Sequence, residues 1–139
     1  MMIEFMGRLY QDDSFRFTGF DGLKIEKLVV VEVIETKSTC LVYIKVKNHN
    51  WHRYFLDYGF AVWEIWNEET IDDKDDGYDY IDKTSELHLL AKQIVKIWCE
   101  PLDNHCQVII EFIDYEKIIL RPINSKDPES DVEFINYRF

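Results

Sequence analysis

The sequence predicts an α+β fold, in which a curved and predominantly antiparallel sheet of about seven strands carries one amphipathic helix on one face. Short segments rich in valine, isoleucine and aromatic residues alternate with turn residues, which is typical of strands and hairpins. Residues 84–98 have helical periodicity instead. The chain has 139 residues, of which 47% are hydrophobic, and so fits a single domain over 1–139 with a sizeable core.

The expected strands follow from period-two patterns and from the turns that bound them. Residues 25–34 carry apolar side chains on both alternating faces, which predicts a strand covered on both sides. Gly59 can adopt the positive φ of a tight turn, so 51–57 and 60–66 are predicted to form a hairpin. The other extended segments are 2–10, 15–20, 41–47, 107–113, 117–123 and 132–139.

The expected helix covers residues 84–98. Apolar residues there recur at spacings of three and four and would share one face: Leu87, Leu90, Ala91, Ile94, Val95 and Trp98. Asp82 or Thr84 would cap the first turn by accepting a backbone N–H, and Pro101 would prevent the helix from continuing. The apolar stripe would then cover the sheet.

The sequence favours a cytoplasmic protein. Its longest apolar run, residues 40–44, is far shorter than the roughly 20 residues of a membrane-spanning helix. Glu4 and Arg8 interrupt the stretch that would have to be the apolar part of a signal peptide. The odd number of cysteines does not suit a disulfide framework and indicates reduced thiols. These cysteines are Cys40, Cys99 and Cys106.

The chain is strongly acidic, and most of the charge lies in one segment. A formal net charge of −11 opposes binding to nucleic acid or anionic membranes and favours a basic protein partner. Within an acidic loop expected at 67–82, eight carboxylates stand against Lys74 alone, which is a net charge of −7. The carboxylates are Glu68, Glu69, Asp72, Asp73, Asp75, Asp76, Asp79 and Asp82. The alternative to a binding surface is that this charged segment is a solvated loop.

Aromatic residues flank this acidic loop. Trp63 and Trp98 are expected in the core, whereas Trp66, Tyr78 and Tyr80 are candidates for contact with a partner, because tryptophan and tyrosine dominate interface energetics. The predicted partner-binding surface therefore combines these three residues with the eight carboxylates. The sequence leaves the oligomeric state open.

No metal or cofactor is expected. A calcium-binding EF-hand with Gly77 at its sixth position would place Lys74 and Lys83 at ligand positions, so that motif is excluded, although looser calcium binding stays an alternative. Cys99, His105 and Cys106 have zinc-ligand chemistry but no standard spacing, and buried or solvated thiols are the favoured interpretation.

No catalytic motif accompanies these features. The serines do not lie in a nucleophile elbow, and the glycines are isolated. Glu111, Asp114, Glu116 and Lys117 resemble the acidic set of a metal-dependent nuclease, but the acid-x-Lys spacing fails at Tyr115, so a polar hairpin turn is expected. His49 and His52 are expected at the surface beside a turn.

The leading functional hypothesis is a small acidic inhibitor, such as an immunity protein that neutralises a basic, nuclease-like bacterial toxin by covering its functional surface. Two alternatives stay open. One is an enzyme or ligand-binding protein with a pocket between helix and sheet. The other is an acidic regulatory subunit that responds to calcium.

Overall fold

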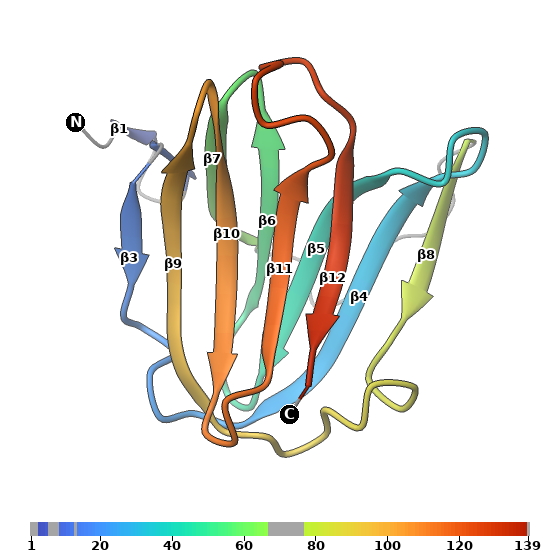
Figure 1. Cartoon of the computed structure of the whole chain (residues 1–139). Helices are drawn as coiled ribbons and strands as arrows, with labels where there is room; N and C mark the ends of the chain where they lie inside the picture. The colour runs from blue at the N-terminus through green and yellow to red at the C-terminus, as the bar shows by residue number, and fades with distance from the viewer. Residues whose placement is uncertain (1–2, 6–8, 13, 67–76, 139) are drawn as a thin grey trace.

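The chain forms two packed antiparallel sheets in the computed structural model, which describes residues 3–5, 9–12, 14–66 and 77–138 (Figure 1). The larger sheet has the order β1-β2-β7-β6-β5-β4-β8, and the smaller has the order β12-β11-β10-β9-β3. The described residues contain no helix. The α+β prediction is therefore wrong, and the fold is all-β.

The strand bounds agree with most of the expected segments. The larger sheet contains β1 (Ile3–Phe5), β2 (Leu9–Asp12), β4 (Ile25–Val33), β5 (Thr39–Val46), β6 (Trp51–Asp57), β7 (Phe60–Trp66) and β8 (Tyr78–Asp82). The smaller sheet contains β3 (Phe15–Phe17), β9 (Ile94–Leu102), β10 (His105–Phe112), β11 (Lys117–Pro122) and β12 (Val132–Tyr137). The single strand expected at 2–10 is instead the paired strands β1 and β2.

The segment predicted to be a helix is a series of turns followed by strand β9. His88 and Ala91 have φ values of 54° and 66°, which a right-handed helix does not contain. Leu90, on the predicted apolar face, is 70% exposed, whereas Leu89, off that face, is fully buried. From Ile94 onward the chain pairs with β10 as an antiparallel strand.

A β-bulge explains why β9 resembles a helix in sequence. Glu111 pairs with Lys96 but Phe112 pairs with Ile94, so Val95 is an extra residue on β9. The extra residue places Ile94 and Ile97 on the same buried face although they are three residues apart. Spacing of three is also the spacing of a helical stripe, and periodicity alone does not separate the two.

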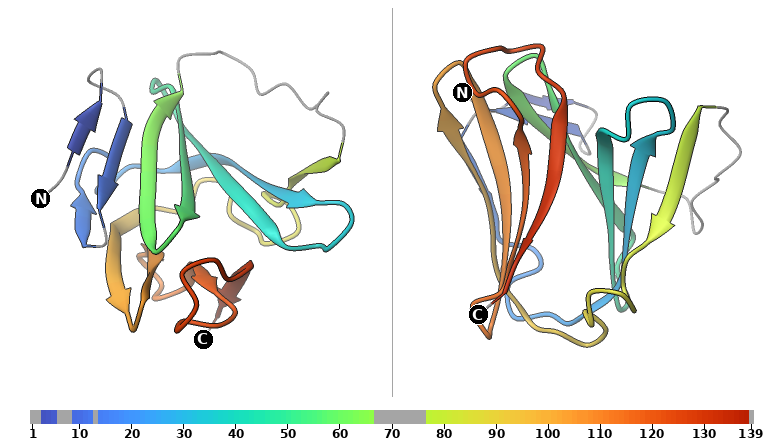
Figure 2. Two further views of the ribbon diagram at one scale, coloured as in Figure 1. Left: turned by 90° about the horizontal axis from the view of Figure 1, so that it is seen from above. Right: turned by 45° about the vertical axis from the view of Figure 1, so that its right-hand side comes forward.

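The main core lies between the two sheets (Figure 2). Leu28, Val30 and Ile44 enter it from the larger sheet, and Ile97 and Ile110 enter it from the smaller one. We call the side of the larger sheet that faces this core its inner face. A second cluster lies on the outer face and contains Val29, Val31, Tyr43 and Trp51. These two clusters confirm that β4 is covered on both sides.

The turn predicted at Gly59 is confirmed. Asp57 pairs with Phe60, so Tyr58 and Gly59 form a two-residue loop. Their φ values of 48° and 87° are those of the turn whose twist matches antiparallel strands. Local turn chemistry thus determines the register of the β6–β7 hairpin.

Replacing Tyr54 with phenylalanine should not weaken the fold. The Tyr54 hydroxyl is buried and has no hydrogen-bond partner in the described part of the chain, and burial raises its pKa. Since a buried polar group without a partner costs about 1–3 kcal/mol, Tyr54→Phe should leave the free energy of unfolding unchanged or raise it by about 1 kcal/mol. Urea unfolding measures this, with Tyr58→Phe, at a site 63% exposed, as the control. A loss above about 1 kcal/mol would show that the hydroxyl has a partner.

Candidate functional site

The described part of the predicted binding surface is strand β8, at the edge of the larger sheet (Figure 1). Of the expected contact residues, Tyr78, Asp79, Tyr80 and Asp82 belong to this strand. The expected loop is therefore shorter than 67–82, because its last residues pair with β4. For Trp66 the structure describes only the backbone, in β7. Six predicted contact residues lie outside the described residues: Glu68, Glu69, Asp72, Asp73, Asp75 and Asp76.

Two of the four β8 residues stabilise the fold. The Tyr80 ring is half-buried and stacks on Tyr43 with 6.3 Å between the ring centroids. The Asp82 carboxylate accepts a hydrogen bond of 2.9 Å from the backbone N–H of Thr84. Burial raises the pKa of Asp82, but the hydrogen bonds from Thr84 and the charge of Lys27 outweigh it and lower the pKa. The capping predicted for Asp82 thus occurs, at a turn and not at a helix.

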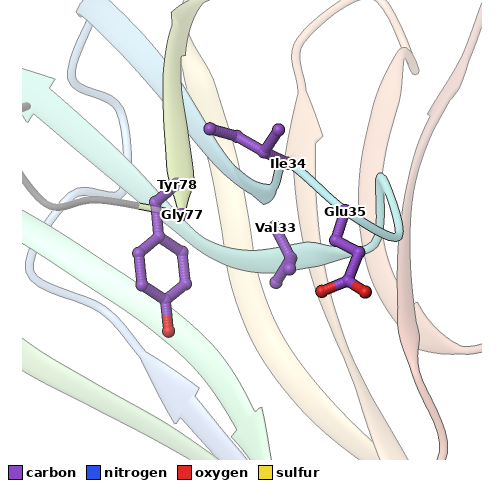
Figure 3. Close-up of a pocket in the computed structure, with 5 residues that line it drawn as sticks. All are labelled: Val33, Ile34, Glu35, Gly77 and Tyr78. Carbon is purple, nitrogen blue, oxygen red and sulfur yellow. The ribbon is translucent and has the colours of Figure 1, made fainter.

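Tyr78 lies at the start of β8 and lines a surface pocket of about 370 Å³ (Figure 3). Val33, Ile34 and Glu35, from the end of β4 and the turn after it, and Gly77 complete the lining. Tyr78 pairs with Val33 across the two strands, and Ile34 donates a backbone hydrogen bond of 2.9 Å to Gly77. In Figure 3 the Tyr78 ring, Val33 and the Glu35 carboxylate point to the same side.

This pocket combines three kinds of surface. Val33 and Ile34 are apolar, the Tyr78 ring is 40% exposed, and the exposed Glu35 carries a negative charge. A lysine or arginine side chain has a long apolar stem and a cationic end, and cations bind both carboxylates and aromatic faces. The pocket is therefore complementary to a basic side chain. Sequence reasoning did not select Glu35, because only the pairing of β4 with β8 brings it beside Tyr78.

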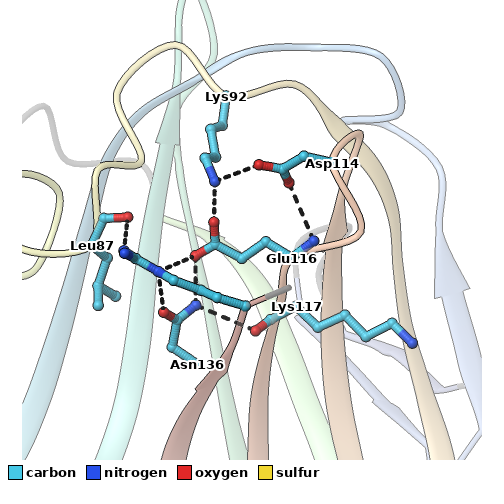
Figure 4. A network of polar contacts seen from close by, with 7 residues as sticks. Leu87, Lys92, Asp114, Glu116, Lys117 and Asn136 are labelled. Carbon is cyan, nitrogen blue, oxygen red and sulfur yellow. Dashed lines mark hydrogen bonds and ion pairs between the residues drawn. The ribbon is translucent and has the colours of Figure 1, made fainter.

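Asp114 and Glu116, at the β10–β11 turn, belong to a structural ion-pair network (Figure 4). Glu116 is 3% exposed and binds the Lys92 ammonium group. Its second carboxylate oxygen accepts hydrogen bonds from Asn136 at 2.7 Å and from Arg138 at 3.3 Å. Arg138 also donates to the backbone carbonyl of Leu87. The network joins the 84–92 segment to β11 and β12. The sequence predicted only a polar hairpin turn here and not these connections.

One of the two histidines expected at the surface is buried. His49 is exposed, as expected, but His52 is only 5% exposed and contacts the rings of Phe17 and Phe20 at centroid distances of 4.6 and 4.4 Å. The surface position predicted for His52 is therefore wrong. Its place on β6 puts it on the inner face beside the core residue Ile44.

Trp63 is buried as predicted, and Trp98 is not a core residue. Trp98 is half-buried, and the ammonium group of Lys96 lies 4.4 Å from the centre of its ring. Its neighbours Ile97 and Cys99 face the core instead. Period-two alternation along β9 therefore places Trp98 on the opposite face.

The cysteines and His105 show no metal-ligand arrangement within the described chain. Cys99 and Cys106 are buried and are not joined in a disulfide, and His105 Nδ1 accepts a hydrogen bond of 2.9 Å from the Cys106 backbone N–H. The described residues contain no group of three or more histidine, cysteine, aspartate or glutamate side chains that could hold a metal ion. Looser calcium binding by 68–76 lies outside the described residues.

None of the described segments is a helix that is long and apolar enough to span a membrane. The pocket between helix and sheet that was expected for the enzyme or ligand-binding alternative is not formed, because residues 84–98 are turns followed by strand β9. Comparisons of the chain with protein-family models, with curated proteins and with solved structures found no match.

Proposed function

We propose that this protein binds a basic protein partner through the surface around β8 and the β4–β5 turn. The observation that carries the proposal is the pocket of Glu35, Tyr78, Val33 and Ile34, which lies where the acidic segment joins β8. A basic side chain of the partner would enter this pocket. The carboxylates of the acidic segment that precedes β8 in the sequence would attract the partner from a distance and accelerate association.

The narrower form of the proposal is an inhibitor of the immunity-protein kind, which acts in the cytoplasm on a nuclease-like toxin. A nuclease has a basic surface for phosphates, and an acidic protein can cover that surface. The net charge of −11 on a chain of 139 residues supports this role. A calcium-responsive regulatory subunit is the alternative for the same carboxylates.

Affinity capture tests the proposal. Wild-type protein is immobilised beside a variant in which Asp72, Asp73, Asp75, Asp76 and Asp79 are changed to asparagine, and lysate of the source cell is applied at low and high salt. We expect wild type to retain a basic protein that the variant loses, with a drop in affinity of about a hundredfold for the purified pair. The high-salt arm should weaken the same interaction because salt screens surface charges.

A second variant with the same change of charge is the control. It replaces acids on other parts of the surface by their amides: Asp57, Glu86, Asp103, Glu111 and Glu129. This control should capture the same basic protein as wild type. If both variants lose the interaction equally, or both keep it, the surface around β8 is not the binding site.

A further inference from the structure

A groove runs along β12, the edge strand of the smaller sheet. Figure 2 shows this strand, in red, across from β4 and β5 of the larger sheet. It has a volume of about 280 Å³. One wall is formed by Val132, Glu133 and Phe134 of β12 with Ile123 and Asp131 of the preceding loop. The other wall is formed by Glu32, Lys83, the β4–β5 turn at 36–38 and Thr39 at the start of β5.

The groove exists because the two sheets differ in width. In the smaller sheet β11 lies against β6 and β12 lies against β5. The smaller sheet ends at β12, whereas the larger sheet continues beyond β5 with β4 and β8. Part of the space below this overhang is filled by the 84–92 segment, whose Leu89 is fully buried. The rest, next to the β4–β5 turn, is the groove.

The free edge of β12 presents backbone hydrogen-bonding groups to this groove. Ile123 donates a backbone hydrogen bond of 2.9 Å to Asp131, and bonded pairs alternate with non-bonded pairs along antiparallel strands. Val132, opposite Pro122, and Phe134, opposite Leu120, are therefore non-bonded pairs whose N–H and C=O groups point away from β11. In the described chain no strand pairs with this side of β12.

We propose that this groove binds an extended segment of a partner protein, which adds to the smaller sheet as an antiparallel strand beside β12. The bound segment would lie between β12 and the wall that contains Glu32 and Lys83, with alternate apolar side chains beside Val132 and Phe134. Its other side chains would lie beside Glu133, whose side chain is 37% exposed and only 3.7 Å from Arg121 in a long ion pair, so a basic residue of the segment fits there. This inference goes beyond the proposed function because the added strand pairs through its backbone.

A second copy of this chain does not fit the groove. A dimer that joined two β12 edges would place the larger sheet of each copy in the layer already occupied by β4 and β8 of the other copy. The overhang therefore admits a single strand and excludes a sheet edge with a second sheet behind it. An extended segment has the required width of one strand, about 5 Å.

Two N-methylated peptides test the proposal. The probe is a synthetic peptide of about six residues in which lysine and valine alternate. Residues directly opposite each other share a face of the sheet. The valines of the peptide would therefore lie opposite the apolar Val132 and Phe134, and their backbone groups would make the hydrogen bonds to β12. Methylation of the valine nitrogens should weaken binding at least about tenfold, whereas methylation of the lysine nitrogens should change it less than about threefold.

The two peptides have the same mass and charge, so electrostatic attraction cannot separate them. Calorimetry gives the affinities, and hydrogen exchange of the Val132 and Phe134 amides should slow when the unmodified peptide binds. Ser38→Trp, which fills the groove, should abolish binding, whereas Thr18→Trp on an exposed turn should not. Equal binding of both methylated peptides, or no binding of the unmodified peptide at millimolar concentration, overturns the inference and leaves the proposal for the β8 surface untouched.

Discussion

Glu116→Gln should lower the free energy of unfolding by about 2–3 kcal/mol. The carboxylate is buried and binds Lys92, Asn136 and Arg138. The substitution keeps the size of the side chain but removes the charge that these partners share. Removal of one member of a buried charge network leaves the others incompletely compensated.

Urea unfolding followed by tryptophan fluorescence measures the effect of Glu116→Gln. The matched control is Asp114→Asn, because Asp114 also binds Lys92, at 2.7 Å, but its side chain is 51% exposed. That control should cost at most about 0.5 kcal/mol, as exposed ion pairs contribute little. If Glu116→Gln lowers the free energy of unfolding no more than this control does, the network does not stabilise the junction between 84–92 and the C-terminal strands.

The stabilisation by Glu116 should disappear in acid. Burial raises the pKa of Glu116, but the hydrogen bonds from Lys92 and Asn136 and the charges of Lys92 and Arg138 outweigh it, so the pKa lies below the usual value of 4.5. A carboxyl group with a lowered pKa stabilises the fold above its unfolded pKa and loses this contribution as the pH falls. The difference between wild type and Glu116→Gln should therefore decrease below about pH 4.5.

The second large effect is a loss of stability between pH 6.5 and 4 that depends on His52. Burial, with a smaller contribution from the charge of His49, lowers the pKa of His52 from 6.5 to about 4. Below pH 6.5 the unfolded chain therefore binds a proton that the folded protein excludes, and the folded state loses stability. At pH 4.5 this should amount to about 2.5 kcal/mol, from 1.36 kcal/mol per pKa unit.

His52→Phe separates this titration from all others. Phenylalanine keeps an aromatic ring beside Phe17 and Phe20 but cannot bind a proton. The free energy of unfolding of wild type relative to this variant should fall by about 2.5 kcal/mol from pH 7.5 to pH 4.5, as measured by urea unfolding at several pH values. Parallel curves for the two proteins would mean that His52 binds its proton at the same pH in the folded and in the unfolded state.

The sequence prediction placed His52 at the surface because the residues that bury it are distant in the chain. It lies close to the β5–β6 turn, where polar residues are normally solvated. Phe17, from the smaller sheet, and Phe20 enclose its ring, and neither residue is near it in sequence. Glu116 is similar, because its partners Lys92, Asn136 and Arg138 come from other parts of the chain.

For the candidate site, the sequence identified the charge and the aromatic residues but not their geometry. Tyr78 is at a pocket, whereas Tyr80 and Asp82 are used in packing and capping. Glu35 belongs to the pocket only because β8 pairs with the far end of β4. The edge of β12 had no sequence signal, since an edge is defined by the strand that is missing beside it.

The sequence by itself determined where most strands and hairpin turns form, because alternation of side chains and positive-φ turns are local properties. Tertiary structure decided the rest. Residues 94–98 have a helical spacing, yet they form a strand because β10 offers a hydrogen-bonded neighbour and the bulge at Val95 turns Ile94 inward. The all-β class, the buried charges and the open groove all depend on pairing between segments far apart in the chain, which local patterns do not encode.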